Sequence, residues 1–243
     1  MAFLEVKKLS KSFGGLQVLR NIDFRLEQGE ILGLIGPNGS GKTTLFNLIT
    51  GFLRASTGRI IFEGRDITKA QNHHVCRAGI ARTFQLVRPF PHLTALQNVM
   101  VGRMYGTKAA RSLKEAREES ESILDATGLG AKKFHAAQSL TLPDRKRLEL
   151  AKALATGPKL LLIDEMMAGL NLTETEDAIK LVKSIRDSGI TLMVVEHVMR
   201  AVLGISDRIM VLHAGEKIAE GPPQEIISNP QVIEAYLGKS SYA

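Results

Sequence analysis

Buried-strand patterns and helical patterns alternate along the chain, and together they predict an α/β protein. Largely apolar runs, which are typical of parallel strands buried on both faces, occupy residues 30–35, 159–165, 191–197 and 208–212. Apolar residues recur at helical spacing over residues 45–49, 144–155 and 173–188. Strands that alternate with helices in this way predict a mostly parallel sheet covered by helices.

Two parts of the chain depart from this alternation. Residues 2–27 and 56–68 carry short strand patterns separated by glycine turns, which predicts an antiparallel β subdomain at the N-terminal end. Residues 73–85 are expected to form a helix and then a strand that runs from Ile80 and ends at Gln85.

The composition shifts toward helix formers between about residues 94 and 138. Ser112 and Glu115 have the spacing of a capping box, and Gly128 is placed to end the helix that begins there. We interpret this stretch as a helical subdomain inserted into an α/β core that comprises residues 1–93 and 139–222. Residues 223–243 predict a C-terminal helical tail, so residues 1–243 are expected to form a single domain.

Length, charge and cysteine content limit the classes of function. The 243 residues suffice for one large α/β domain, and the single cysteine, Cys76, excludes an intrachain disulfide and a cysteine-based zinc cluster. No apolar run approaches the ~18 residues of a membrane-spanning helix, so we expect a soluble chain or one that docks on a membrane-bound partner. The net charge of +7 allows an anionic partner, but the basic residues are scattered, which favours a solvated surface.

A glycine-rich segment between the first buried run and the next helix matches the phosphate-binding pattern G-x-x-x-x-G-K-[ST]. Its glycines allow successive backbone N–H groups to point at one anion, and its lysine can reach the β- and γ-phosphates of a nucleotide. The hydroxyl group after the lysine can ligate Mg²⁺, and the helix N-terminus adds partial positive charge. The predicted nucleotide-binding residues are Gly36, Pro37, Asn38, Gly39, Ser40, Gly41, Lys42, Thr43 and Thr44.

Further candidate residues for metal binding and catalysis stand at the ends of predicted strands. Asp164 is placed to hold Mg²⁺, because ligands gather at the carboxyl ends of parallel strands, and Glu165 is a candidate base for a water molecule. His197 is a candidate contact to the γ-phosphate. Gln85 either ligates Mg²⁺, orients water or caps a loop. Phe13 either stacks on adenine or packs in its turn.

The whole chain resembles the ATPase subunit of an ATP-binding cassette (ABC) transporter, because these motifs occur in that family's order. The resemblance implies a P-loop NTPase (RecA-like) core, the cofactors ATP and Mg²⁺, and hydrolysis of ATP coupled to transport. It makes Phe13 the adenine-stacking aromatic, Glu165 the catalytic glutamate, His197 the switch histidine, and Ala168–Asn171 the D-loop. The implied metal ligands are Thr43, Gln85 and Asp164, with Gln85 also the Q-loop residue that contacts ATP.

Three segments look like the branched-chain amino acid importer class, and within it like the larger of two ATPase subunits. They are Gly79–Gln85, Asn98–Gly102 and Val232–Gly238. This resemblance implies two transmembrane permease subunits, a second ABC ATPase subunit and, indirectly, an extracytoplasmic solute-binding protein. It implies a peripheral position at the cytoplasmic face of the cell membrane and import of branched-chain or related amino acids.

The signature loop departs from the family's Leu-Ser-Gly-Gly-Gln type sequence and reads Leu140, Thr141, Leu142, Pro143 and Asp144. Pro143, expected at the first position of the next helix, has no N–H to offer a phosphate, and Asp144 is expected to bring negative charge toward it. Because each ATP of the family lies between one chain's phosphate loop and the other chain's signature loop, a heterodimer with one competent site is expected. The alternative is that Thr141, with Arg145 or Lys146, compensates.

Two other classes of function compete with transport. A nucleic-acid-associated ABC-type ATPase agrees with the positive charge, but such proteins usually carry long coiled coils or zinc modules, which this sequence lacks. A small-molecule kinase would need an acceptor pocket and lid arginines instead of the combination of Gln85, Glu165 and His197. No nucleic-acid partner is therefore expected.

Overall fold

A six-stranded sheet lies at the centre of the chain, of which the computed structural model describes residues 2–85 and 89–237. The strand order is β10-β9-β3-β8-β7-β6; β10 runs antiparallel to β9, and the other neighbours are parallel. This is the mostly parallel sheet that the apolar runs predict. Its strands are β3 (Ile31–Ile35), β6 (Ile80–Arg82), β7 (Leu160–Asp164), β8 (Thr191–Val195), β9 (Arg208–His213) and β10 (Glu216–Gly221).

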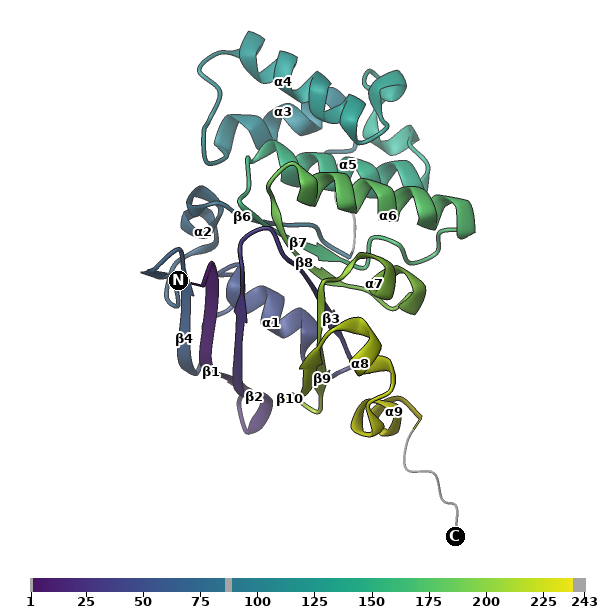
Figure 1. Cartoon of the computed structure of the whole chain (residues 1–243). Helices are drawn as coiled ribbons and strands as arrows, with labels where there is room; N and C mark the ends of the chain where they lie inside the picture. The colour runs from purple at the N-terminus through teal and green to yellow at the C-terminus, as the bar shows by residue number, and fades with distance from the viewer. Residues whose placement is uncertain (1, 86–88, 238–243) are drawn as a thin grey trace.

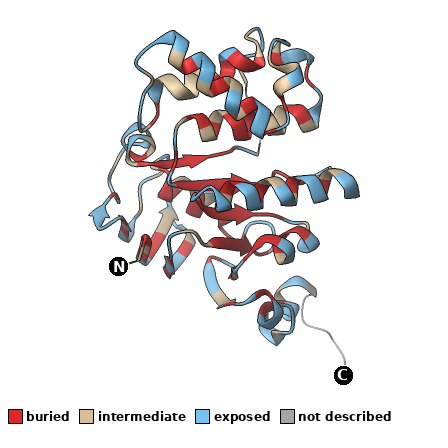
Figure 2. Ribbon diagram, turned by 45° about the horizontal axis from the view of Figure 1, so that its top comes forward, coloured by how far each residue is buried: buried red, intermediate tan, exposed pale blue. Residues whose placement is uncertain are grey.

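Helices cover both faces of this sheet, as the ribbon in Figure 1 shows. The strands β3, β7 and β8 are buried at every position, because their side chains point alternately into two apolar layers. Figure 2 shows these strands as a continuous buried layer. The covering helices are α1 (Lys42–Ile49) on one face, and α5 (Leu142–Ala155), α6 (Leu172–Asp187) and α7 (Met199–Ile205) on the other.

A second, antiparallel sheet of order β2-β1-β4-β5 packs on the other side of α1, and it is the predicted N-terminal β subdomain. Gly58 of this sheet has φ +92 and faces an irregularity in the pairing of β1 with β4. A Cβ atom added to Gly58 would lie 2.4 Å from the carbonyl oxygen of Lys8, so the close approach of the two strands requires glycine. The strands are β1 (Leu4–Phe13), β2 (Leu16–Leu26), β4 (Thr57–Phe62) and β5 (Arg65–Asp66).

A separate apolar cluster holds the helical region at the top of Figure 1. It joins Leu96 and Val99 to Leu124 and to Leu148 and Ala151 of α5. Because α5 contributes to this cluster as well as to the core, the subdomain boundaries near residues 94 and 138 stay a prediction. The helices of the region, with the short helix that precedes β6, are α2 (Asn72–Ala78), α3 (Ala95–Tyr105) and α4 (Leu113–Ala126).

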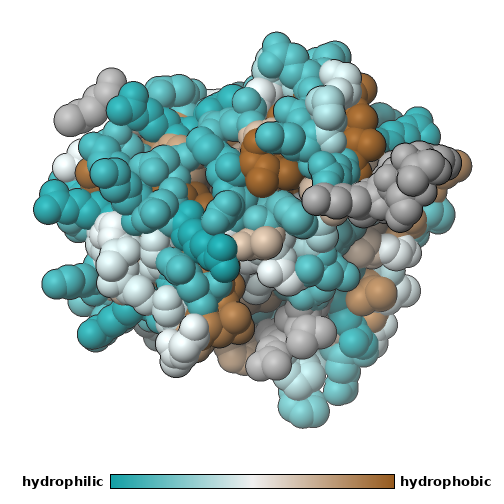
Figure 3. Space-filling view, turned by 90° about the horizontal axis from the view of Figure 1, so that it is seen from below, coloured by the Kyte–Doolittle hydropathy of each residue, from teal (hydrophilic) through white to brown (hydrophobic). Residues whose placement is uncertain are grey.

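Two short helices, α8 (Pro223–Ile227) and α9 (Pro230–Leu237), follow β10 and pack near β9, as the tail pattern predicts. Residues 238–243 of the predicted tail lie outside the described residues. The face seen from below in Figure 3 is mainly hydrophilic, with apolar side chains in separate patches. Among the described residues, no helix is long and apolar enough to cross a membrane.

The predicted strand from Ile80 to Gln85 is shorter than expected, because β6 ends at Arg82. The backbone N–H of Thr83 still bonds to the carbonyl of Leu162 at 2.9 Å, and the chain then leaves the sheet. Gln85 is therefore a loop residue and not the last residue of a strand.

Two helix starts also differ in detail from their predicted form. Ser112 caps α4 by accepting the N–H of Glu115, but the Glu115 carboxylate accepts the N–H of Arg111, so the capping box is half formed. Pro143 stands at the second and not the first position of α5. The helix begins one residue earlier because the Thr141 side chain caps it.

Candidate active site

The phosphate-binding pattern forms a loop between β3 and α1 that is built for close approach. Gly36 has φ +150, and an added Cβ atom there would lie 2.0 Å from the carbonyl oxygen of Leu212. The Lys42 side chain folds into the loop, where Nζ donates to the carbonyls of Gly36 at 2.7 Å and of Pro37 at 3.0 Å. Burial lowers the pKa of Lys42, and the nearby carboxylates Glu165 and Asp164 oppose this shift.

Asp164 ends β7 as predicted, but its carboxylate is already paired. Nη2 of Arg82 donates to Oδ2 of Asp164 at 2.5 Å, and the two side chains are 5% and 2% exposed. Burial raises the pKa of Asp164, whereas the Arg82 guanidinium opposes this shift. Nη1 of Arg82 donates to Oδ1 of Asn47 on α1 at 2.5 Å, so the arginine connects β6, β7 and the helix after the phosphate loop.

Glu165 lies between two other predicted site residues. Nε2 of Gln85 donates to Oε2 of Glu165 at 2.6 Å, and Nε2 of His197 lies 2.8 Å from Oε1. The two partners come from loops after β6 and β8, on either side of β7. Each carboxylate oxygen therefore has a neighbour, which fixes the orientation of the group relative to Lys42.

Three other predicted contacts to the nucleotide or the metal are exposed or partly buried side chains. Thr43 is exposed and Thr44 partly buried, and within the described chain neither side chain makes a hydrogen bond. Phe13 is 45% exposed at the tip of the β1–β2 hairpin, with Nζ of Lys11 4.7 Å from its ring centroid. The roles of these three residues as metal and adenine contacts stay predictions.

The signature loop lies apart from this constellation: in the described chain, no hydrogen bond or ion pair joins residues 140–144 to the phosphate loop. Oδ2 of Asp144 accepts from Nζ of Lys132 at 2.6 Å and from the Thr141 hydroxyl at 2.7 Å. Burial raises the pKa of Asp144, but these two donors outweigh it and leave the pKa below its usual value. In the single chain the negative charge of Asp144 is paired with Lys132, and its effect on a partner's phosphate stays a prediction.

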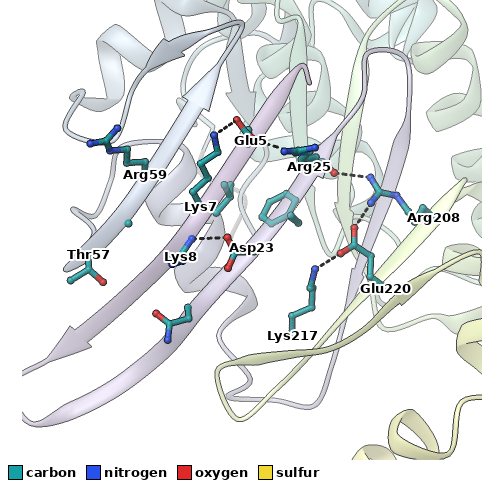
Figure 4. Close-up of a pocket in the computed structure, with 14 residues that line it drawn as sticks. Glu5, Lys7, Lys8, Asp23, Arg25, Thr57, Arg59, Arg208, Lys217 and Glu220 are labelled. Carbon is teal, nitrogen blue, oxygen red and sulfur yellow. Dashed lines mark hydrogen bonds and ion pairs between the residues drawn. The ribbon is translucent and has the colours of Figure 1, made fainter. Parts of the chain in front are cut away.

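A cavity of about 980 Å³ lies elsewhere, on the outer face of the antiparallel sheet (Figure 4). Its side chains pair mainly with one another: Glu5 accepts from Lys7 at 2.8 Å and from Arg25 at 3.0 Å, and Glu220 pairs with Arg208. None of the predicted site residues lines this cavity. The candidate site therefore remains the one at the carboxyl ends of the parallel strands.

The sequence reasoning missed the local contacts of three residues near the site, although it considered Lys146 as a possible phosphate contact. Arg82 pairs with Asp164, Glu196 accepts the N–H of Met167 at 2.6 Å, and Lys146 donates to the carbonyl of Ala168. A charged residue inside or at the end of an apolar run was the available signal for Arg82 and Glu196. Lys146 carried no such signal, because it stands on a helix rich in charged residues.

Comparison with known families agrees with this geometry. A family model described as ABC transporter matches residues 19–168, which is more than half of the chain. The chain belongs to the ABC transporter family. A second model, described as branched-chain amino acid ATP-binding cassette transporter, matches residues 216–241 of this ABC ATPase.

Individual relatives cover almost the whole ABC ATPase chain. The high-affinity branched-chain amino acid transport ATP-binding protein BraF of Pseudomonas aeruginosa is 37% identical over 250 residues, which cover 98% of both chains. The ADP conformation of the ATP-binding cassette MJ1267 superposes with a TM-score of 0.89 at 32% identity and covers 98% of this chain and 100% of that one. The dimeric cassette MJ0796 bound to ADP and Pi gives a TM-score of 0.82 at 25% identity and covers 90% and 98%.

The cofactors of this ABC ATPase are ATP and Mg²⁺, and the phosphate loop fits them. Oγ of Ser40 is buried in the loop without a hydrogen-bond partner among the described residues, and it lies 2.8 Å from where a Cβ of Gly36 would stand. An unsatisfied hydroxyl and a lysine that bonds only to loop carbonyls suit an anion that the loop encloses.

We predict that Asp144→Asn lowers the free energy of unfolding at pH 7 by about 1 kcal/mol, because the variant loses the charged partner of half-exposed Lys132. The depressed pKa makes this contribution present above the unfolded value of about 3.9, and it is lost as the pH falls through the lower folded value. Urea unfolding of both chains at stepwise lower pH measures it. Glu118→Gln, in the exposed pair with Lys114, is the control, and a pH-independent Asp144→Asn deficit would contradict the assignment.

Proposed function

We propose that the chain is the ATP-hydrolysing subunit of a membrane importer of branched-chain or related amino acids, held at the cytoplasmic face of the membrane. The observation that carries the proposal is Glu165, bracketed by Gln85 and His197 beside Lys42 and Asp164. The C-terminal family match and the likeness to BraF support the substrate class. No observation favours the nucleic-acid-associated alternative.

Each residue has a role that follows from its position. The loop amides and Lys42 bind the phosphates, and Thr43, Gln85 and Asp164 would hold Mg²⁺, which supplies charge stabilisation at the phosphates. Glu165 accepts the proton of the attacking water, and its two neighbours keep the carboxylate oriented. His197 would contact the γ-phosphate. Phe13 stacks on the adenine ring.

Two variants separate binding from chemistry and test the proposed function. Lys42→Ala removes phosphate charge and is expected to weaken ATP binding strongly with an unchanged melting curve. Glu165→Gln keeps the shape of the site and is expected to bind ATP normally but to lower turnover ~10²–10⁴-fold and trap an ATP-bound closed dimer. Nucleotide titration and steady-state hydrolysis in the assembled complex measure both. Near-normal turnover of Glu165→Gln would overturn the role of the base.

An apolar cavity of about 350 Å³ supports docking of the membrane subunits between the core and the helical region. Phe52 and Phe84 meet edge to face at 5.5 Å on its wall, and both rings are partly exposed. Val101 and Ala153 also line it. Phe84 precedes Gln85, so a segment docked here would contact the chain next to the Glu165 site. Nucleotide state could then move the helical region as a hinge.

The docking proposal predicts that crosslinks from the permease subunits fall within Leu86–Met104, of which Leu86–Arg88 lie outside the described residues. Cys76, which lines the same cavity, is first replaced by alanine. A cysteine at Val101 is then expected to crosslink in the assembled complex, whereas one at exposed Ile227 on α8 is not. Crosslinks confined to Ile227 would make this docking site wrong.

The signature loop supports a heterodimer with unequal sites. The Thr141 hydroxyl is engaged by Asp144, Pro143 lacks an N–H, and the Arg145 guanidinium donates to the carbonyls of Leu140 and Gln138. Lys146 is held by the carbonyls of Glu165 and Ala168. The groups that could compensate for the lost glycines are thus bound within the chain, so a partner's ATP would meet few free donors.

We therefore expect little ATP hydrolysis from the purified chain, and substantial hydrolysis once a second ATPase subunit supplies a glycine-containing signature loop. Restoring glycines with Leu142→Gly and Pro143→Gly should raise hydrolysis by the chain alone, because backbone N–H groups become available to phosphate. Steady-state rates of the two forms, each compared with its Glu165→Gln variant, test this. Robust, cooperative hydrolysis by the unaltered chain would show that its loop already works in a homodimer.

A further inference from the structure

The residue proposed as the catalytic base has an unusual backbone conformation. Glu165 lies in the left-handed region with φ +49. A residue with a Cβ atom is disfavoured there, so surrounding contacts must hold it. The turn after β7 therefore needs an anchor that a sequence motif for the base does not include.

Two anchors come from the end of β8. The N–H of Glu165 bonds to the carbonyl of Val195 at 2.9 Å, and the N–H of Met167 bonds to Oε1 of Glu196 at 2.6 Å. Glu196 is 1% exposed, and its Oε2 atom has no hydrogen-bond partner among the described residues. A buried carboxylate is costly unless it is paired and hydrogen-bonded, so the partly satisfied Glu196 calls for an explanation.

A third anchor comes from α5. Nζ of Lys146 donates to the carbonyl of Ala168 and lies 3.4 Å from the carbonyl of Glu165. It also provides a positive charge near Glu196: burial raises the pKa of Glu196, and the charge of Lys146 opposes this rise. The turn from Glu165 to Ala168 is thus held by its N–H groups on one side and by its carbonyls on the other.

We propose that Glu196 and Lys146 are positioning residues that lock this turn, so that the Glu165 carboxylate stays between Gln85 and His197. The proposal rests on the proposed function only in taking Glu165 as the base. Neither residue needs to touch the nucleotide, because both act through the backbone of residues 165–168. Glu196 also directly precedes His197, so one segment fixes the base and its neighbour together.

Lys146 also connects the turn after β7 to α5, the helix that begins in the signature loop. Lys146 stands five residues after Thr141, the cap of α5, in the same helix that presents the altered signature loop. A tilt of α5 on association with a partner would therefore move the carbonyl contacts of Glu165 and Ala168. Lys146 thus links the turn that carries the proposed base to the helix that carries the signature loop.

The test compares turnover with nucleotide affinity in the assembled complex. Glu196→Leu removes the acceptor for Met167 and is expected to lower kcat ~10–100-fold, because a small displacement of a catalytic group costs about that much. ATP affinity should stay within about twofold, since the phosphate loop is untouched. Glu196→Gln keeps a carbonyl acceptor and should restore most of kcat. At the other anchor, Lys146→Met is expected to lower kcat in the same way, and Lys146→Arg, which keeps the charge, should restore most of it.

Thr191→Val is the matched control, because Thr191 is a fully buried residue of β8, the strand that Glu196 follows, and its hydroxyl accepts the N–H of Gly29 at 3.0 Å. It should lower the melting temperature and leave kcat unchanged. Equal kcat in Glu196→Leu and Thr191→Val would overturn the proposal, as would a joint loss of kcat and ATP affinity. If Glu196→Leu does not fold, the Lys146 pair decides by the same criteria.

A double variant separates this proposal from the assignment of the base. Adding Glu196→Leu to Glu165→Gln should cost no further turnover, because the lock acts through Glu165. An additional loss in the double variant would show that Glu196 acts by another route. If Glu165→Gln alone keeps normal turnover, the proposed function fails instead, whatever Glu196→Leu does.

Discussion

The register of three buried parallel strands is the constraint on which the site depends. Leu34 of β3 and Asp164 of β7 both pair with Val195 of β8, so β7 and β8 end at the same level and β3 ends one residue further on. Because the strands are parallel, the segments that leave them emerge at the same edge. A shift of β7 by one residue would turn Asp164 to the opposite face of the sheet, and the chain would lose the carboxylate proposed to hold Mg²⁺ without losing its sheet.

Charge burial adds a second constraint at this edge. Asp164, Arg82, Glu196 and Lys42 are each less than a tenth exposed. Arg82 pairs with Asp164, Lys42 donates to loop carbonyls, and Glu196 accepts the N–H of Met167. Removing one member of a buried pair typically costs 3–5 kcal/mol, because the other charge is left without compensation. The Arg82–Asp164 pair is therefore tied to the stability of the core, and neither member can change alone without that cost.

The sequence was sufficient for the fold class, the phosphate loop and the order of the buried strands, because buried parallel strands and glycine loops have local signatures. It also led to Gln85, Glu165 and His197, which the structure joins directly. It did not predict that β6 stops at Arg82, since strand ends depend on which neighbour continues the ladder. The partners of Asp144 and Asp164 were also missed, because Lys132 and Arg82 approach them through tertiary packing, which periodicity does not encode.

The left-handed backbone at Glu165 has an evolutionary consequence. Glycine is the residue that this conformation suits, and a side chain there costs about 1–2 kcal/mol. Selection for folding stability alone would therefore favour glycine at this position. A lineage that keeps the glutamate does so because selection on turnover outweighs selection on folding. A homologue that carries glycine here would relieve the backbone strain and would lack the carboxylate that we propose as the base.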